Sequence, residues 1–165
     1  MDPDRSEIEP ALARAGAFAR AYLAGLDDRP VRSERMEAAL AAFEGALPEE
    51  GAGADAVLAR LFENAGDAAL ATGGPRSYHF VMGGTTPAAL GGELAAGVLD
   101  QAAYAWASSP LGTTLERTAL DWLAQLFELP GGLTGIMTTG ATMSNFVGLA
   151  AARQWWGERH GVDVS

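Results

Sequence analysis

The fold is decided by the stretch Gly135-Ile136-Met137-Thr138-Thr139-Gly140-Ala141-Thr142-Met143-Ser144-Asn145. The apolar run from Leu133 to Thr138 is typical of a short strand. Gly140 supplies a turn, and a helix is expected from Ala141 through Trp155. The stretch therefore predicts a strand, a glycine turn and a helix in succession.

The first turn of that helix is suited to an anion. The first backbone N–H groups of a helix have no partner inside the helix, and the helix dipole adds positive potential there. Gly140 and Ala141 leave room for close approach, while Thr142 and Ser144 offer hydroxyl donors. These features predict a phosphate site, and a simple helix cap at Thr142 remains the alternative. The segment is neither a P-loop nor a dinucleotide fingerprint.

The sequence before this stretch predicts an N-terminal helical arm over residues 1–74. Apolar residues recur at helical spacing in three segments, and a capping-box pattern, Ser6-x-x-Glu9, precedes the first. The Gly73-Gly74-Pro75 break ends the arm. The expected helices run from Ser6 to the stop at Asp27, from Ser33 to Ala46 and from Ala54 to Ala71.

The second predicted region covers residues 75–165. Residues 76–82 are expected to be extended, and a glycine turn follows them. Thr86 is positioned to cap a helix whose first residue is Pro87. Thr113 or Thr114 is expected to open another helix, which carries an apolar stripe as far as Phe127.

Composition excludes several classes of function. The formal net charge of −10 argues against a nucleic-acid partner, and the absence of cysteine excludes disulfides and thiolate metal sites. No metal site is expected from His79 and His160 alone. No stretch is apolar enough to span a bilayer and the first residues are acidic, so we expect a cytoplasmic protein.

All eleven basic residues are arginine, and the chain contains no lysine. An enzyme that binds its cofactor or substrate covalently through its own lysine is therefore excluded for this chain taken alone.

Several motifs, in order, resemble the group II pyridoxal-dependent decarboxylases, the family of the aromatic-L-amino-acid and glutamate decarboxylases. Thr138 to Phe146 resembles the family's cofactor-phosphate segment, and Phe80 to Leu90 resembles its substrate-side loop. The resemblance extends to Ser108-Ser109-Pro110, Thr114-x-Glu116, Trp122-Leu123 through Leu129-Pro130, and Tyr22 to Leu26 with Arg29-Pro30-Val31.

The resemblance implies a fold and a function. The fold would be α/β: an N-terminal helical arm, then the beginning of a fold type I large domain, similar to aspartate aminotransferase, with an incomplete sheet. The activity would be decarboxylation of an L-amino acid with pyridoxal 5′-phosphate (PLP), by a homodimer. Ala141 and Thr142 match the positions that bind the cofactor phosphate. Positions at the substrate pocket match Phe80, Val81, Gly83, Gly84 and Pro110.

In the family, the lysine that holds the cofactor, the residue stacked on its ring and the acidic partner of its ring nitrogen lie further along the chain. The 165 residues are thus expected to be inactive alone. As a monomer they are expected to expose apolar surface and to lack a sharp two-state melting transition. They could be a truncated product, a fragment, or one part of a split enzyme with a second chain that carries the lysine. A non-catalytic helical interaction module, and an aminotransferase or desulfurase-type lyase, remain as alternatives.

His79 and His160 are read as incidental, the latter in a polar tail. Glu116 and Asp121 lie five residues apart on one predicted helix and so point in different directions. Glu116 is therefore interpreted as structural and Asp121 as a surface residue, rather than as an acid–base pair.

Overall fold

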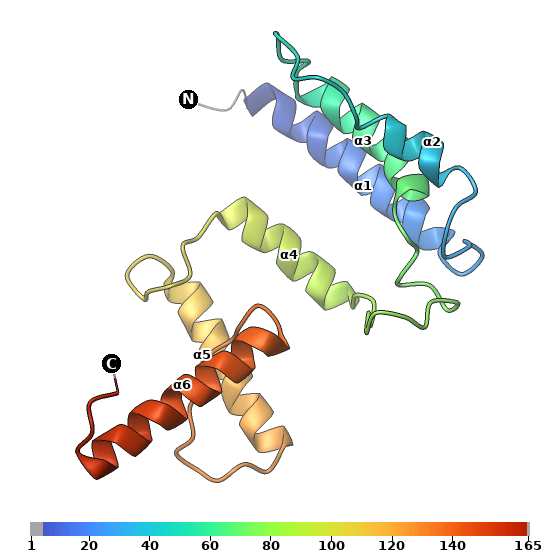
Figure 1. The fold of residues 1–165 in the computed structure, drawn as a ribbon. Helices are drawn as coiled ribbons and strands as arrows, with labels where there is room; N and C mark the ends of the chain where they lie inside the picture. The colour runs from blue at the N-terminus through green and yellow to red at the C-terminus, as the bar shows by residue number, and fades with distance from the viewer. Residues whose placement is uncertain (1–4, 165) are drawn as a thin grey trace. The chain divides into compact units, whose positions relative to one another are not determined.

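The computed structural model describes residues 5–164, and its helices follow one another without an intervening strand in that range (Figure 1). The residues form two units, Met1–Gly91 and Gly92–Ser165. The boundary between them falls inside helix α4, Pro87–Leu99.

The first unit is built on helices α1 (Ile8–Ala24) and α3 (Ala54–Ala68), which pack side by side, with the short helix α2 (Met36–Ala41) against α3. A single 3-10 turn, Arg5–Glu7, precedes α1. The Phe18 ring is stacked between those of Tyr22 and Phe62, at centroid distances of 5.7 and 4.9 Å. Among the residues described, the buried apolar side chains are Met36, Ala39 and Ala71.

Several ends of these helices differ from the expectation. Helix α1 ends at Ala24 and α2 at Ala41, before the predicted ends at Asp27 and Ala46. Helix α1 begins at Ile8 with Glu7 as its N-cap residue and no side-chain cap, so the capping box at Ser6 is wrong. Helix α2 does not include Ser33, because the Ser33 hydroxyl donates to Asp67 and accepts from the Arg35 N–H outside the helix. Helix α3 ends before Ala71, whose N–H donates to the Val31 carbonyl at 2.9 Å.

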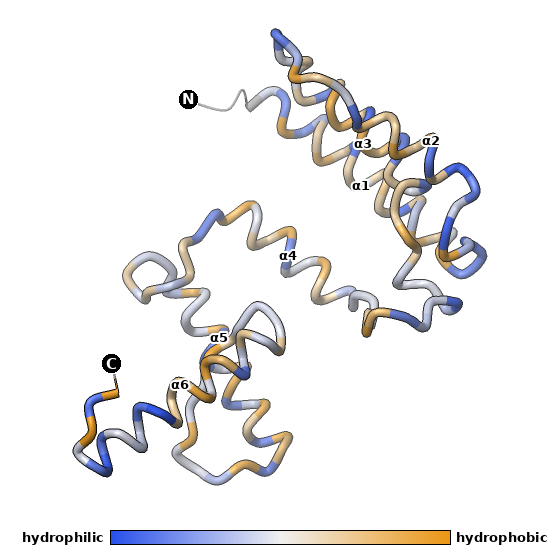
Figure 2. The backbone as a smooth tube through the Cα atoms, viewed as in Figure 1, coloured by the Kyte–Doolittle hydropathy of each residue, from blue (hydrophilic) through white to orange (hydrophobic). Residues whose placement is uncertain are grey.

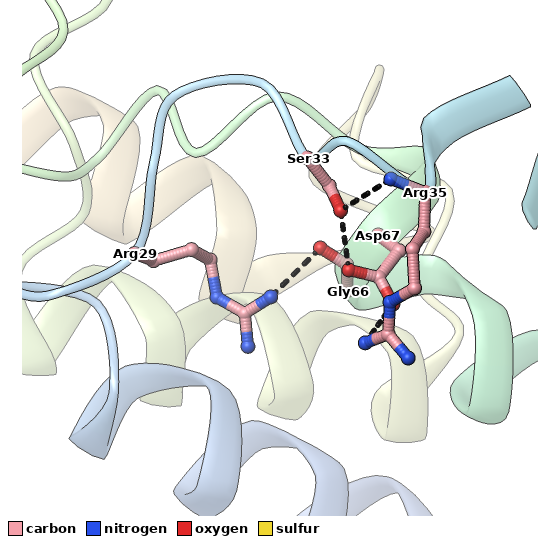
Figure 3. Close-up of polar contacts among 5 residues, drawn as sticks. All are labelled: Arg29, Ser33, Arg35, Gly66 and Asp67. Atoms are coloured by element: carbon pink, nitrogen blue, oxygen red, sulfur yellow. Dashed lines mark hydrogen bonds and ion pairs between the residues drawn. The ribbon is translucent and has the colours of Figure 1, made fainter.

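Polar contacts attach the loop between α1 and α2 to the end of α3 (Figure 3). An Arg29 guanidinium N–H donates to the Gly66 carbonyl at 2.9 Å. The Asp67 carboxylate accepts from the Ser33 hydroxyl at 2.7 Å and forms an ion pair with Arg35 at 2.7 Å. Because Asp67 is partly buried, these contacts hold the loop more firmly than surface ion pairs do.

Helix α4 begins as predicted. The Ala89 N–H donates to the Thr86 hydroxyl at 3.2 Å, and Pro87 occupies the first helical position. The helix lacks a packing partner in the described chain: all its residues are exposed, including Leu90, Leu94 and Val98. Figure 2 shows orange, hydrophobic stretches along the α4 tube.

In the second unit, helix α5 spans Pro110–Leu126, so the start predicted at Thr113 or Thr114 is three or four residues late. Ser109 is the N-cap residue, and its hydroxyl accepts from the Gly112 N–H at 3.2 Å. Pro110 stands at the first position, where its missing N–H is not needed. The Thr113 and Thr114 hydroxyls bond to carbonyls of the preceding turn instead.

The α/β prediction, including a type I large domain with an incomplete sheet, is wrong for residues 5–164, which are helices and loops. Residues 76–82 form turns, and residues 133–138 form an irregular segment. A strand needs a neighbour to complete its ladder of backbone hydrogen bonds. Residues 133–138 have none within the described chain, and the Met137 N–H donates to the Glu116 carboxylate instead.

Helix α6, Ala141–His160, begins at the predicted residue and continues past Trp155, so His160 lies in its last turn rather than in a polar tail. Gly161 ends it in the left-handed conformation. The tail then folds back: the Val162 N–H donates to the Gly157 carbonyl at 3.0 Å. Gly157 is buried there, and a Cβ atom on it would lie 2.8 Å from the Val164 side chain.

The chain exposes 13475 Å² of surface. Two separate compact domains of these lengths would together expose about 9,300 Å². The excess is apolar in large part, because most large hydrophobic side chains outside the first unit are exposed, among them Trp106, Trp122, Trp155 and Trp156.

Candidate functional site

The N-terminus of α6 presents backbone N–H groups that no side chain caps. Gly140 has φ of 102°, a conformation that favours glycine, and a Cβ atom there would meet nothing within 4 Å. No side chain caps this end of the helix, and the first bond back to the turn is from the Ser144 N–H to the Gly140 carbonyl. The N–H groups of Ala141 and Thr142 thus have no acceptor within the helix, and both residues are exposed.

The segment that leads into α6 is attached to α5. The Glu116 carboxylate accepts the Met137 N–H at 2.7 Å, which agrees with the structural role expected for Glu116. Leu120 lies 3.4 Å from the position that a Cβ atom on Gly135 would take. Helix α5 and residues 129–136 border an open hollow of about 490 Å³, lined largely by apolar side chains. The position of the α6 N-terminus therefore depends on α5.

The loop predicted to contact substrate lies in the first unit. Phe80 and Val81 both have positive φ, 60° and 62°, and their side chains are 79% and 103% exposed. A β-branched residue rarely adopts this conformation, so the backbone here is strained. The His79 and Phe80 rings meet edge to face at 6.2 Å.

Gly83 and Gly84 complete the same loop, and both are exposed. Gly84 has φ of 76°, and a Cβ atom on it would approach Gly73 at 3.8 Å. The glycine at position 84 is therefore required by the turn, whatever else the loop does.

Each predicted site residue can now be placed. Phe80, Val81, Gly83 and Gly84 share one loop of the first unit. In the second unit, Pro110 opens α5, where helix initiation accounts for it, and Ala141 and Thr142 open α6. Sequence reasoning missed the cap at Ser109, although Ser followed by Pro is a recognised signal for the start of a helix.

The N-terminus of α6 offers hydrogen-bond donors for an anion. Within residues 5–164, no cluster of three or more His, Cys, Asp or Glu side chains is arranged to hold a metal ion. No helix in that range is long and apolar enough to cross a membrane.

Comparison with known families decides the relationship. The pyridoxal-dependent decarboxylase conserved domain matches residues 41–161. The chain belongs to this family. The resemblance to the group II decarboxylases is therefore confirmed.

Curated relatives share part of the chain. An L-2,4-diaminobutyrate decarboxylase of Rhizobium meliloti (strain 1021) is 34% identical over 106 residues, which are 64% of this chain and 21% of the relative. The aromatic-L-amino-acid decarboxylase of Catharanthus roseus is 35% identical over 71 residues, 43% of this chain and 14% of the relative. A 4-hydroxyphenylacetaldehyde synthase of Rhodiola rosea is 28% identical over 160 residues, which are 91% of this chain and 32% of the relative.

The fold occurs in solved structures. The Oryza sativa TDC, crystallised with PLP and tryptamine, matches with a TM-score of 0.80 at 23% identity, over 99% of this chain and 37% of that one. The chain thus spans about a third of the solved structure and less of most curated relatives.

Proposed function

We propose that this chain contributes to the PLP-dependent decarboxylation of an L-amino acid, as the part that binds the cofactor phosphate and forms one wall of the substrate pocket. Two observations support the proposal. The family match covers residues 41–161, and within it the N-terminus of α6 has free N–H donors and no side-chain cap. The similar proteins include decarboxylases and one aldehyde synthase. The assignment of decarboxylation to this chain is therefore part of the proposal.

The residues at the start of α6 suit the phosphate group. The backbone N–H groups of Ala141 and Thr142, with the Thr142 hydroxyl, would donate to phosphate oxygens, and the helix dipole favours the negative charge. When bound, the cofactor supplies an electron sink for the electrons released as carbon dioxide leaves. The chain's own task is to fix the position of the phosphate, and Glu116 contributes by holding the segment before the helix.

In the first unit, the proposed substrate contacts are the loop residues Phe80, Val81, Gly83 and Gly84; in the second unit, Pro110 is proposed separately as a substrate contact of the complete enzyme. The exposed Phe80 ring offers an apolar surface for a substrate side chain. Gly83 and Gly84 leave the backbone accessible to a substrate carboxylate.

Covalent attachment of the cofactor requires a lysine, and these residues contain none. We propose that the lysine, the ring-stacking residue and the acidic partner of the ring nitrogen come from further protein, either a longer form of this chain or a second chain. In the complete enzyme we expect a homodimer, in the cytoplasm.

Phosphate recognition is testable without catalysis. The probe is 4′-deoxypyridoxine 5′-phosphate, which has no aldehyde and cannot react with amines. We expect it to bind in equilibrium dialysis, and its unphosphorylated form to bind far more weakly.

Removing the hydroxyl with Thr142→Ala should weaken binding of the phosphorylated probe about tenfold, because a hydrogen bond to a charged group is lost. Thr114→Ala, at the start of α5, is the matched control and should leave binding unchanged. Equal binding of the two probe forms would contradict the proposal.

The catalytic proposal needs the chain together with the lysine-bearing protein. We expect that assembly to retain PLP after borohydride treatment and to release carbon dioxide from an L-amino acid. The absent lysine favours one competing function, a non-catalytic helical interaction module. An assembly that shows no borohydride-fixed cofactor would support that alternative.

A further inference from the structure

The loop that carries Phe80 and Val81 is closed at its base. This closed loop, residues 73–84, begins and ends at the same place in the first unit, where the backbones of Gly73 and Gly84 are in contact. A Cβ atom on Gly84 would lie 3.8 Å from the Gly73 Cα. Surface loops of this length whose ends meet are Ω-loops, and they frequently carry function.

The start of the closed loop is attached to the segment that follows α1. A Cβ atom on Gly74 would lie 3.2 Å from the Leu26 carbonyl oxygen, so the two backbones approach closely there. Two residues further on, the Arg76 guanidinium donates to the Arg29 carbonyl at 3.2 Å. Within residues 5–164, the Arg76 side chain makes no other hydrogen bond or ion pair. This contact is therefore what fixes its position.

The tip of the closed loop has little support of its own. Phe80 and Val81 have positive φ, and the side chains of both are exposed. Among the described residues, the aromatic partner of the Phe80 ring is its neighbour His79. A disfavoured backbone conformation persists only where the surrounding structure over-determines it. Because the tip makes few contacts, that constraint must come from the base of the loop.

We propose that Arg76 is a positioning residue, which keeps the closed loop shut and thereby holds Phe80 and Val81 in the conformation that the structure shows. The inference rests on the proposed function, in which Phe80 contacts the substrate. Arg76 acts through the loop alone, by joining its start to the Arg29 carbonyl. Because a single N–H donor makes this link, a lysine ammonium group can replace it, whereas alanine cannot.

Chymotrypsin cleavage of the 165-residue chain tests whether Arg76 keeps the loop shut. Cleavage after Tyr78 or Phe80, followed by mass spectrometry, reports how often the loop opens. We expect Arg76→Ala to raise this rate about fivefold, because one hydrogen bond is lost, and Arg76→Lys to keep the original rate. Gly84→Ala should open the loop from its other end, because φ there is 76°.

Two controls separate opening of the loop from a general loosening of the chain. Tyr104 in the second unit is 87% exposed, close to the 84% of Tyr78, and cleavage after Tyr104 should not change in any variant. Arg32→Ala removes an exposed arginine that pairs with Glu37, and it should leave the loop closed. An unchanged rate in Arg76→Ala, an equal rise at Tyr104, or a lysine variant cleaved as fast as the alanine variant would overturn the positioning role.

The chain assembled with the lysine-bearing protein tests whether the loop matters for the reaction. We expect Arg76→Ala to raise KM for the L-amino acid about fivefold with kcat little changed, and Arg76→Lys to restore KM. Phe80→Ala distinguishes the two proposals. If it raises KM while Arg76→Ala does not, the positioning role fails and the substrate contact stands. If Phe80→Ala leaves KM unchanged, the substrate contact itself fails, whatever the cleavage rates show.

Discussion

Ser109 is 1% exposed and is the most deeply buried polar side chain among the described residues. Its hydroxyl satisfies the Gly112 N–H, a donor that α5 cannot satisfy from within. Since Glu116 on α5 in turn holds the segment that leads to α6, the cap at Ser109 supports the predicted phosphate site from a distance.

Removing this cap should destabilise the second unit. We expect Ser109→Ala to lower amide protection at the start of α5 about fivefold, from a loss of about 1 kcal/mol, measured by hydrogen exchange. Gly112→Ala should also destabilise, because the new Cβ atom would lie 2.6 Å from the Ser109 hydroxyl oxygen. In the double variant most of that clash is gone, so the two effects should be less than additive. Full additivity would show that the two residues act independently.

The contact between Glu116 and Met137 makes a second prediction at this scale. Glu116→Ala should speed hydrogen exchange at the Met137 amide about tenfold, because a hydrogen bond to a charged acceptor is lost. Asp121→Ala on the same helix serves as the control and should leave that amide unchanged. A similar effect from both variants would mean that α5 loosens as a whole.

Among the helices, α4 has the least tertiary support. It is 13 residues long, every residue is exposed, and it contains Gly91, Gly92 and Gly97. An isolated helix of about this length is marginal in water, and each interior glycine lowers its stability further.

Alanine at these glycines should therefore strengthen the helix. A Cβ atom on Gly92 or Gly97 would meet nothing within 4 Å. Each glycine-to-alanine change should raise amide protection in α4 about fivefold, from a gain of about 1 kcal/mol, as measured by hydrogen exchange. Ala95→Gly should lower it by a similar factor. Glycine variants that lose protection would indicate that close backbone packing needs these positions.

Local signals predicted the helix starts where capping chemistry is self-contained. Thr86 with Pro87, and Gly140 before Ala141, lie where expected because each start depends only on neighbouring residues. The strand expected at Leu133 to Thr138 was wrong because a strand depends on a partner elsewhere, which local sequence does not reveal. Residues 76–82 became turns for the same reason, and Phe80 and Val81 adopted a conformation that propensity disfavours.

The predicted site could be inferred only in part. The donors at Ala141 and Thr142 follow from the pattern of turn and helix. The support from Glu116 is a contact across 21 residues, and the exact partner is not readable from spacing.

For the whole molecule, the large exposed apolar area has a consequence in solution. The purified chain should bind a hydrophobic dye, associate as its concentration rises and unfold over a broad temperature range, because few side chains form a cooperative core. Dye fluorescence, light scattering and calorimetry measure these properties. A sharp, reversible two-state melt of the isolated chain would contradict the prediction.

The placement of the tryptophans gives the second unit a natural optical reporter. All four tryptophans, Trp106, Trp122, Trp155 and Trp156, belong to the second unit, while the first contains Tyr22 and Tyr78 but no tryptophan. Emission excited in the red edge of the indole band thus reports on the second unit alone. Because these indoles are exposed, their emission should shift to shorter wavelength when a partner covers them. The covering of the second unit by a partner could therefore be followed in unlabelled protein.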